Sequence, residues 1–391
     1  MIKNNKRLIV IAAVTLVGAL GYGIVIPILY PYSVKYGLSD FENGILFSVF
    51  SICQFISTPV IGMLSDRYGR RPLLIISLIG TAVSFFIMAF APSALFLFLA
   101  RALDGLTAGN FPVAQAVISD SIEGQDRAKG FGIIGACFGI GFIAGPAISA
   151  LTVGISMSLP FIIAGIISVI AVILAFTLLD ETNPHIGQVE HKKLFDFKKL
   201  GKTLFDKRVG STLLITFLWA FAFGMFIFAF QPFSLKIIGL TSKGVSLVFV
   251  MFGAIGLVSQ LFLVPRVSKK LGVLTAFTLA LFTLTASFTL LFFVKTLTGL
   301  IIASIIMGLS NSIIQTLSST VLSLETEPQR QGEIMGVNFS YMSLGQIVGP
   351  LAGGAVALLA INYAFLAGAV LILICFLISR KIRLTAENNP K

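Results

Sequence analysis

The chain consists of apolar runs that are each about as long as a lipid bilayer is thick. A membrane-spanning helix takes about 20 mostly apolar residues. The predicted spans are residues 8–30, 43–64, 72–90, 94–120, 129–153, 158–179, 211–233, 244–264, 273–293, 297–323, 333–358 and 362–379. Only 11% of the residues are charged, less than half the share of about 25% in soluble domains. The sequence therefore predicts an all-α integral membrane protein with twelve transmembrane helices.

The basic residues predict the orientation of these spans. If loops alternate between the two sides, one side receives most of the basic residues: both chain ends, Arg67, Arg70, Arg71 and the Lys-rich residues 192–208. The other side receives only Lys35, Lys236, Lys243 and Lys295. Because basic loops mark the cytoplasmic side, we expect both termini to be cytoplasmic in a multi-pass protein of the inner (plasma) membrane. No small-residue cleavage site closes the first run, so we expect it to be a retained span and not a signal peptide.

The two parts of the chain echo one another at a shift of about 204 residues, as expected of a parallel internal repeat. Pro27 corresponds to Pro232, and Gly145-Pro146 corresponds to Gly349-Pro350. The predicted organisation is therefore a six-helix half over residues 1–179, a basic cytoplasmic linker over 180–210 and a second six-helix half over 211–391. Such a design places a substrate site near the midplane between the halves.

Composition argues against several other functions. The three cysteines, Cys53, Cys137 and Cys375, are far apart and indicate neither a disulfide framework nor a metal site. Both histidines, His185 and His191, fall in the polar middle of the chain, so no catalytic His–carboxylate pair can be placed in a span. The net charge of +12 lies between apolar runs instead of on one polar face, which favours a membrane over nucleic acid. We therefore expect neither an enzyme nor a bound cofactor.

The loop at residues 62–72 reads GMLSDRYGRRP. Its glycines permit a tight turn, and Asp66 can form charge-assisted bonds with the neighbouring arginines. From these residues alone, a positively charged cytoplasmic loop without further role is the favoured interpretation.

This loop resembles the signature loop of the major facilitator superfamily, and the likeness extends along the chain. Residues 101–110 (RALDGLTAGN) resemble the fourth-helix motif of the family. Residues 141–146 (GFIAGP) match part of its antiporter motif, and residues 345–354 (GQIVGPLAGG) are a more complete copy. Residues 21–27 (GYGIVIP) are similar to the first helix of the drug/proton antiporter branch. Taken together, these motifs make the chain resemble the tetracycline and multidrug efflux pumps of that branch. The resemblance implies a gating role for Asp66 and Arg70, and Asp120 ends the fourth predicted span on the same side as this loop. We therefore expect Asp66, Arg70 or Arg71, and Asp120 to form a cytoplasmic latch that holds the outward-open state.

Arg101 and Asp104 share one face of the fourth predicted span. Charges within a bilayer are costly and tend to pair or to face a cavity. A purely structural ion pair is one interpretation. The other is proton coupling, in which the proton affinity of Asp104 responds to substrate and to water access. Asp104 is the only acid that the sequence places clearly within a span, and residues 8–30 and 211–233, where related exporters carry one, have none.

The Gly-Pro elements predict a bendable seam between the halves. Proline bends a helix, and glycines on the same face let a neighbouring helix approach closely. The seam residues are Gly141, Gly145, Pro146, Gly345, Gly349 and Pro350. Ordinary close packing is the alternative interpretation.

Other polar and aromatic residues within spans are candidates for a substrate cavity, since drug-like ligands bind in apolar pockets with a few fixed polar groups. For any single aromatic residue, packing against lipid or in the core is the alternative. The candidates are Tyr22, Gln54, Asn110, Phe111, Gln115, Trp219, Phe226, Gln260, Asn311, Gln315, Asn338 and Tyr341.

Together these features predict a monomeric, proton-coupled exporter of amphipathic small molecules that works by alternating access. Its partners are then the substrate, protons and the lipid bilayer. Two alternatives remain open: an importer or facilitator of a sugar, organic acid or osmolyte, and a membrane receptor or scaffold of the same fold that moves no solute.

Overall fold

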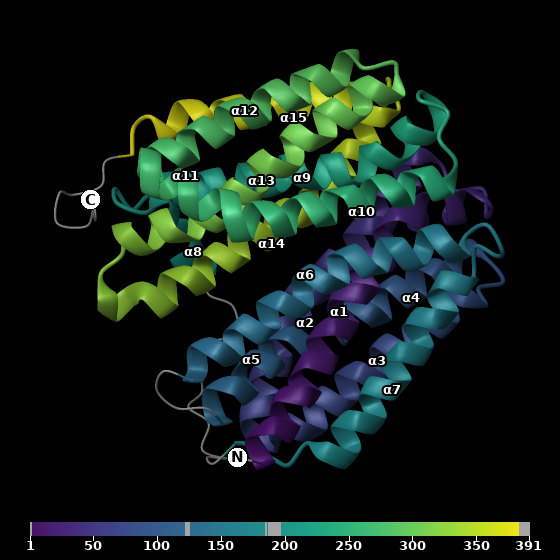
Figure 1. Cartoon of the computed structure of the whole chain (residues 1–391), viewed down its shortest axis with the longest axis vertical. Coiled ribbons are helices and arrows are strands. Elements are labelled where there is room, and N and C mark those ends of the chain that lie inside the picture. The colour runs from purple at the N-terminus through teal and green to yellow at the C-terminus, as the bar shows by residue number, and fades with distance from the viewer. Residues whose placement is uncertain (1, 122–125, 184–185, 187–196, 383–391) are drawn as a thin grey trace. The chain divides into compact units, whose positions relative to one another are not determined.

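A computed structural model describes residues 2–121, 126–183, 186 and 197–382. Within these residues every regular element is a helix (Figure 1). The first group is α1 (Ile2–Val34), α2 (Asp40–Tyr68), α3 (Arg70–Ala89), α4 (Ala94–Leu106), α5 (Asn110–Ser121), α6 (Asp126–Thr152) and α7 (Leu159–Leu178). The second group is α8 (Phe197–Leu204), α9 (Gly210–Lys236), α10 (Ser242–Val258), η1 (Ser259–Leu263), α11 (Val264–Leu271), α12 (Val273–Phe293), α13 (Leu297–Glu325), η2 (Pro328–Arg330), α14 (Gln331–Ala357) and α15 (Tyr363–Ser379).

The described residues contain 9 helices that are long and apolar enough to cross a membrane, and α15 is a shorter apolar helix. Each predicted span is helical, because an apolar backbone in lipid has to satisfy its own hydrogen bonds. The number of twelve spans stays a prediction, since the span expected at residues 94–120 is divided in two and α14 is not among the nine.

The division of residues 94–120 corrects the expected single helix. α4 ends at Leu106 and α5 begins at Asn110, with a tight turn in which Gly109 N–H donates to Thr107 O at 2.7 Å. Pro112 explains the break, because proline lacks the N–H that would bond the carbonyl four residues earlier and its ring clashes with that carbonyl. The interruption follows directly after the helix that carries Arg101 and Asp104.

The span expected at residues 244–264 continues to Leu271 and contains the π-helical segment η1. In this segment Val264 N–H bonds Ser259 O, five residues earlier. Pro265 follows at once and removes the donor for Leu261. Gln260 therefore lies on a locally widened turn, a feature that is often found at functional sites.

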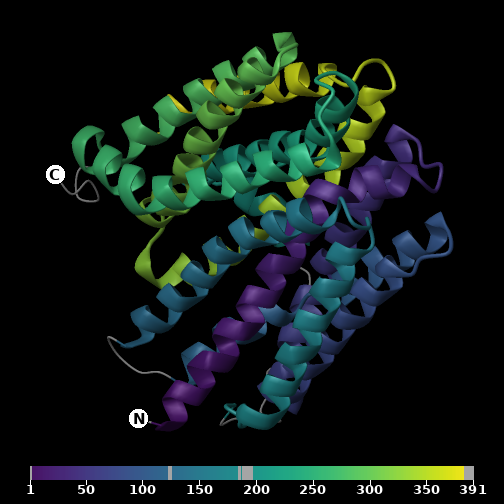
Figure 2. The ribbon, with the colours of Figure 1, turned by 45° about the vertical axis from the view of Figure 1, so that its right-hand side comes forward.

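The chain forms two compact units. The first comprises Met1–Leu38, Val49–Leu194 and Leu240–Val250, and the second comprises Ser39–Ser48, Phe195–Gly239 and Met251–Lys391. In the first unit, α1 packs along α6 and α7, and α3 packs along α7. In the second, α9 packs along α14, and α12 and α15 lie side by side in both views (Figures 1 and 2). The predicted boundaries at 179 and 211 stay a prediction.

Glycines of the Gly-Pro elements let neighbouring helices of the same unit approach closely, and Pro350 also meets Gly44 of α2, which belongs to the first predicted half. The bendable seam between the halves stays a prediction. A Cβ on Gly145 would lie 2.8 Å from Gly23 Cα in α1. A Cβ on Gly349 would lie 2.7 Å from Gly224 Cα in α9. Gly141 and Gly345 meet α1 and α9 as closely, and Pro146 and Pro350 adjoin the same contacts. These small residues hold two helix backbones together where there is little hydrophobic drive for helix association.

The predicted polar linker contains the short helix α8. Leu200 and Leu204 of this helix pack against a cluster at the start of α9 and on α14. Tyr341 donates its hydroxyl proton to Leu200 O at 3.0 Å. Tyr341, expected to line a substrate cavity, therefore fastens α8 to α14.

Candidate functional site

Arg101 and Asp104 form the buried ion pair expected from their spacing. Arg101 Nη1 lies 3.6 Å from Asp104 Oδ2, and their side chains are 6% and 14% exposed. Hydroxyl groups of Thr81 and Ser84 in α3 also bond the Asp104 carboxylate. The Arg101 guanidinium lies over the ring of Phe50, 4.3 Å from its centroid, so that the cation is held on one side by a carboxylate and on another by an aromatic face.

Close packing of α4 on α2 fixes this pair in place. A Cβ on Gly105 would lie 2.5 Å from Phe50 O and 2.7 Å from Cys53 Cβ. Ser57 donates its hydroxyl proton to Gly105 O at 2.8 Å in a buried position. The glycine next to Asp104 therefore lets α4 approach α2 closely enough for Arg101 to reach Phe50.

Aromatic rings surround the same region of the first unit. The Tyr22 ring lies 6.4 Å from that of Phe50 and 5.7 Å from that of Phe142, and Phe138 lies 5.5 Å from Phe142. Tyr22 is 37% exposed, and Gln54 is half-buried. Phe50, Phe138 and Phe142 were not predicted, although Phe138 and Phe142 are four apart on α6 and so share a helix face.

The cavity candidates of the second unit separate into two groups. Trp219 Nε1 donates to Asn311 Oδ1 at 3.0 Å, and the Trp219 ring stacks on Phe223 with centroids 6.2 Å apart. Trp219 is 6% exposed and Phe226 is 1% exposed, and Phe226 packs against Phe230, Phe252, Phe288 and Phe365. Phe226 is therefore a core residue here, which differs from the cavity wall expected from the sequence.

The remaining candidates lie apart from these groups. Gln260 and Gln315 are exposed and Gln115 is half-buried. Asn338 is buried, and its Oδ1 has no hydrogen-bond partner within the described residues. The side chains of Asn110 and Phe111 lie outside the described part of the chain.

Three of the four predicted latch residues come together at one end of the first unit. Arg70 pairs with Asp66, and Arg70 Nε lies 3.0 Å from Asp120 Oδ2. Arg70 also donates to Ser65 Oγ at 2.7 Å. Arg71 points elsewhere: its guanidinium donates to Phe176 O at 2.7 Å at the end of α7.

Glu181, which was not predicted, completes this end of the unit. Its carboxylate accepts the backbone N–H groups of Arg70, Arg71, Thr182 and Asn183, and so caps the N-terminus of α3. Burial of the carboxylate acts to raise its pKa, but the four N–H donors together outweigh burial and hold the pKa below the ordinary value. Gly69 adopts φ +104, and a Cβ there would collide with Glu181. The loop geometry therefore requires glycine next to the capping acid.

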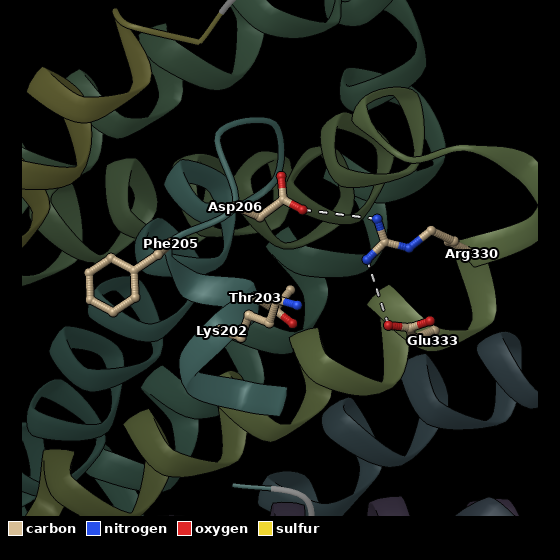
Figure 3. Close-up of a pocket in the computed structure, with 6 residues that line it drawn as sticks. All are labelled: Lys202, Thr203, Phe205, Asp206, Arg330 and Glu333. Carbon is tan, nitrogen blue, oxygen red and sulfur yellow. Dashed lines mark ion pairs between the residues drawn. The ribbon is translucent and has the colours of Figure 1, made fainter. Parts of the chain in front are cut away.

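The second unit has a cavity of about 470 Å³ among charged side chains, shown in Figure 3. Its lining residues are Lys202, Thr203, Phe205, Asp206, Arg330 and Glu333. Arg330 lies 3.9 Å from Asp206 and 3.7 Å from Glu333 and so bridges the two carboxylates. Within the described residues, no group of three His, Cys, Asp or Glu side chains could hold a metal ion.

The sequence matches the profile of the Major Facilitator Superfamily over residues 11–281 and again over residues 212–391. It is 30% identical to the tetracycline resistance protein, class C, of Escherichia coli over 388 residues, which cover 95% of this chain and 96% of that protein. It is 28% identical to multidrug resistance protein 2 of Bacillus subtilis over 366 residues, covering 91% and 90%.

Solved structures share the fold. The bacterial homolog of the human lysosomal transporter Spinster matches with a TM-score of 0.80 at 16% identity and covers 100% of this chain and 99% of that chain. The human organic anion transporter MFSD10 matches with a TM-score of 0.72 at 20% identity, covering 96% and 99%.

Proposed function

Because the chain belongs to the major facilitator superfamily, we propose that it exports amphipathic, drug-like small molecules across the membrane in exchange for protons. Its relatives include proteins named for tetracycline, quinolone and multidrug resistance. In this proposal the protein is a multi-pass monomer with both termini in the cytoplasm. It works as a transporter without catalytic chemistry.

The buried Arg101–Asp104 pair is the observation that carries the proposal. A carboxylate held 3.6 Å from a guanidinium inside an apolar helix bundle is costly and marks a functional position in a membrane protein. When the site opens to one side, water can bring a proton to Asp104 or remove it. Protonation leaves Arg101 without its counter-ion, so that proton binding and the conformation of this unit become coupled.

The character of the surrounding side chains supports an amphipathic substrate. Tyr22, Phe50, Phe138 and Phe142 offer aromatic faces next to the ion pair, a composition suited to drug-like ligands. Neither α1 nor α9 contains an acidic residue. Such acids would help to bind a strongly cationic drug or a tetracycline–metal chelate, so we propose neutral or weakly charged compounds as substrates.

The energetics of exchange are sufficient for export. One proton moving inward releases about 2.3 kcal/mol per 100 mV of membrane potential. Because about 1.4 kcal/mol corresponds to a factor of ten, exchange of one proton for one neutral substrate at 100 mV supports a substrate gradient of about fortyfold.

In the proposed transport cycle, the protein alternates between an outward-open and an inward-open state. The Asp66–Arg70–Asp120 network would hold the cytoplasmic end of its unit in the outward-open state, and its release would open the inward-facing state. Substrate and proton shift this equilibrium only in so far as they bind the two states with different affinity.

Inside-out membrane vesicles that are supplied with fluorescent dyes and drugs in the outer medium test the proposed function. Energised vesicles should accumulate dye, and an uncoupler should release it. Asp104→Asn should abolish accumulation while protein insertion is unchanged, and Asp180→Asn, the same change at an exposed acid, should have no effect. If Asp104→Asn still accumulates dye in an uncoupler-sensitive way, the role of Asp104 is overturned. If the unmodified protein shows no uncoupler-sensitive transport, the proposed export function is overturned.

A further inference from the structure

Helices α9 and α13 of the second unit carry polar side chains that meet one another at several positions. On α9 these residues recur at spacings of four and three, and on α13 at spacings of seven, so each set lies on one helix face. They are Thr212, Thr216 and Trp219 on α9, and Asn311, Ser318 and Glu325 on α13. We call this set the polar file.

The first two rungs of the polar file are closed by hydrogen bonds. Trp219 Nε1 donates to Asn311 Oδ1 at 3.0 Å. The second rung lies about one turn away on α9 and about two turns away on α13, where the hydroxyl oxygens of Thr216 and Ser318 lie 3.0 Å apart in a buried position. These bonds fix the register of α9 against α13, and the same register places Thr212 opposite Glu325.

The third rung is different, because the Thr212 side chain lies against the Glu325 carboxyl with poorer hydrogen-bond geometry than the pairs of the first two rungs have. Thr212 is 0% exposed, and neither its Oγ1 nor Glu325 Oε2 has a hydrogen-bond partner of good geometry within the described residues. Thr212 is nevertheless the side chain that acts most directly on the Glu325 carboxyl. An unsatisfied buried polar group costs about 1–3 kcal/mol, so this rung stabilises the helix pair less than the other two.

Interhelical packing accounts for the first two rungs but not for Glu325. Hydroxyl, amide and indole groups commonly join helices in membranes. A carboxyl at that position needs a counter-ion or a function, and the described residues place no cation in an ion pair with Glu325. Asp206, which precedes α9, is a like charge that acts on Glu325, and Arg330 of η2 is already shared between Asp206 and Glu333.

The polar file connects the middle of the second unit with the charged cavity of Figure 3. From Asn311 to Glu325, α13 rises by about 20 Å at about 1.5 Å per residue, which is roughly two thirds of the hydrocarbon thickness of about 30 Å. At the Glu325 end the file reaches Asp206, which lines the cavity together with Lys202 and Arg330.

We propose that Glu325 is a second proton-binding carboxyl, which exchanges its proton with the cytoplasm through the cavity at Asp206, and that the polar file leads from it toward Asn311. This inference rests on the proposed proton-coupled function. In the binding step a hydronium ion gives its proton to Glu325 Oε2 and leaves as water. In the release step the O–H bond breaks, the proton passes to water in the cavity, and the carboxylate forms again.

Glu325→Gln tests the proposal against Glu327→Gln, which makes the same change two residues away on an exposed acid that pairs with Arg208 at 2.8 Å. Each purified variant is reconstituted in proteoliposomes, where dye–dye exchange without a gradient and dye transport driven by a pH gradient are measured separately. Loss of a positioned proton-transfer group typically costs a factor of about 100 or more. Glu325→Gln should therefore lose gradient-driven transport by about 100-fold and keep exchange, whereas Glu327→Gln should keep both.

The polar file is tested by Thr212→Val, which removes a hydroxyl at nearly constant shape. Ser312→Ala is its control, since the Ser312 hydroxyl bonds only Gly308 O of its own helix, at 2.8 Å. Thr212→Val should lower the number of protons moved per dye and shift the pH profile of transport, while Ser312→Ala should change neither.

The outcomes separate the two proposals. If the unmodified protein moves dye without moving protons, the proposed function fails and the role of Glu325 fails with it. If the unmodified protein couples dye to protons and Glu325→Gln retains the same proton count and pH profile, only the inference about Glu325 is overturned. If Glu325→Gln also loses exchange, its effect is structural and the inference is likewise overturned.

Discussion

Gly349→Ala should destabilise the second unit, because the added methyl group has no room between α14 and α9. Its Cβ would lie 2.7 Å from both Gly224 Cα and Phe221 O. Non-bonded carbon atoms pack at about 3.5–4.0 Å, so the two helices would have to separate by about 1 Å. Overpacking of this kind costs about 1–3 kcal/mol.

Gly336→Ala is the matched control on the same helix. Gly336 is exposed, and a Cβ there would meet nothing within 4 Å. Replacing glycine by alanine inside a helix gains about 0.5–1 kcal/mol in the absence of a clash. The two variants should therefore differ by roughly 1.5–4 kcal/mol in unfolding free energy, with opposite signs relative to the unmodified protein.

The comparison is made in detergent, by following loss of helical circular dichroism on heating or in denaturant. Gly349→Ala should unfold first, the unmodified protein next and Gly336→Ala last. The pair Gly145→Ala and Gly135→Ala should behave in the same way on α6, because a Cβ on Gly145 would lie 2.8 Å from Gly23 Cα whereas Gly135 has open space. If Gly349→Ala matched Gly336→Ala, the close approach of α14 to α9 would be refuted.

Three further predictions concern the end of the first unit that carries Asp66 and Glu181, and the glycine contacts. Glu181→Ala should lower stability by about 1 kcal/mol at pH 7, the typical worth of a helix cap, while Asp180→Ala should not. Because the pKa of Glu181 is lower in the folded protein than its ordinary 4.5, this contribution is present above that value and is lost as the pH falls further. Equal stability differences at pH 7 and at pH 3 would contradict the capping role. Asp66→Asn should slow transport while dye binding survives, and full turnover by this variant would exclude Asp66 from the latch, since single rim pairs are worth little on their own. Gly349→Val should bind dye but lose transport or leak protons, and more so than Gly145→Val, because Gly353 and Gly354 continue the tight surface. Unchanged transport and proton tightness in vesicles would mean that these glycines only pack.

The helical architecture could be predicted because bilayer thickness sets the length of each span. The apolar runs of the sequence therefore correspond to helices, and the resemblance to the superfamily is confirmed. The break before α5 was missed although its cause is local: Pro112 carries the signal, but the surrounding residues are apolar enough to resemble one continuous span.

Pairing between distant residues could not be predicted in the same way. The Gly-Pro elements indicate close helix contact, but not whether the partner helix belongs to the same half. The structure places α1 against Gly145 and α9 against Gly349. Capping by Glu181 was missed for the same reason, since it depends on α7 ending beside the start of α3.

The acids at the ends of apolar runs were the least accessible to prediction. Asp104 stands alone within an apolar run and could be recognised. Glu325 falls two residues beyond the expected span 297–323, whereas α13 continues through it. Its significance depends on Thr212 and Asp206 from another segment, which no pattern along the chain brings together.

Counting protons against dye molecules tests the central claim most directly. Purified protein is reconstituted in proteoliposomes, and a pH-sensitive dye outside the vesicles is read together with transport of a fluorescent substrate. The unmodified protein should move a fixed number of protons, at least one, in the direction opposite to each substrate molecule, and Asp104→Asn should exchange substrate without moving protons. Substrate transport by the unmodified protein without proton movement, or an unchanged proton count in Asp104→Asn, would contradict the account.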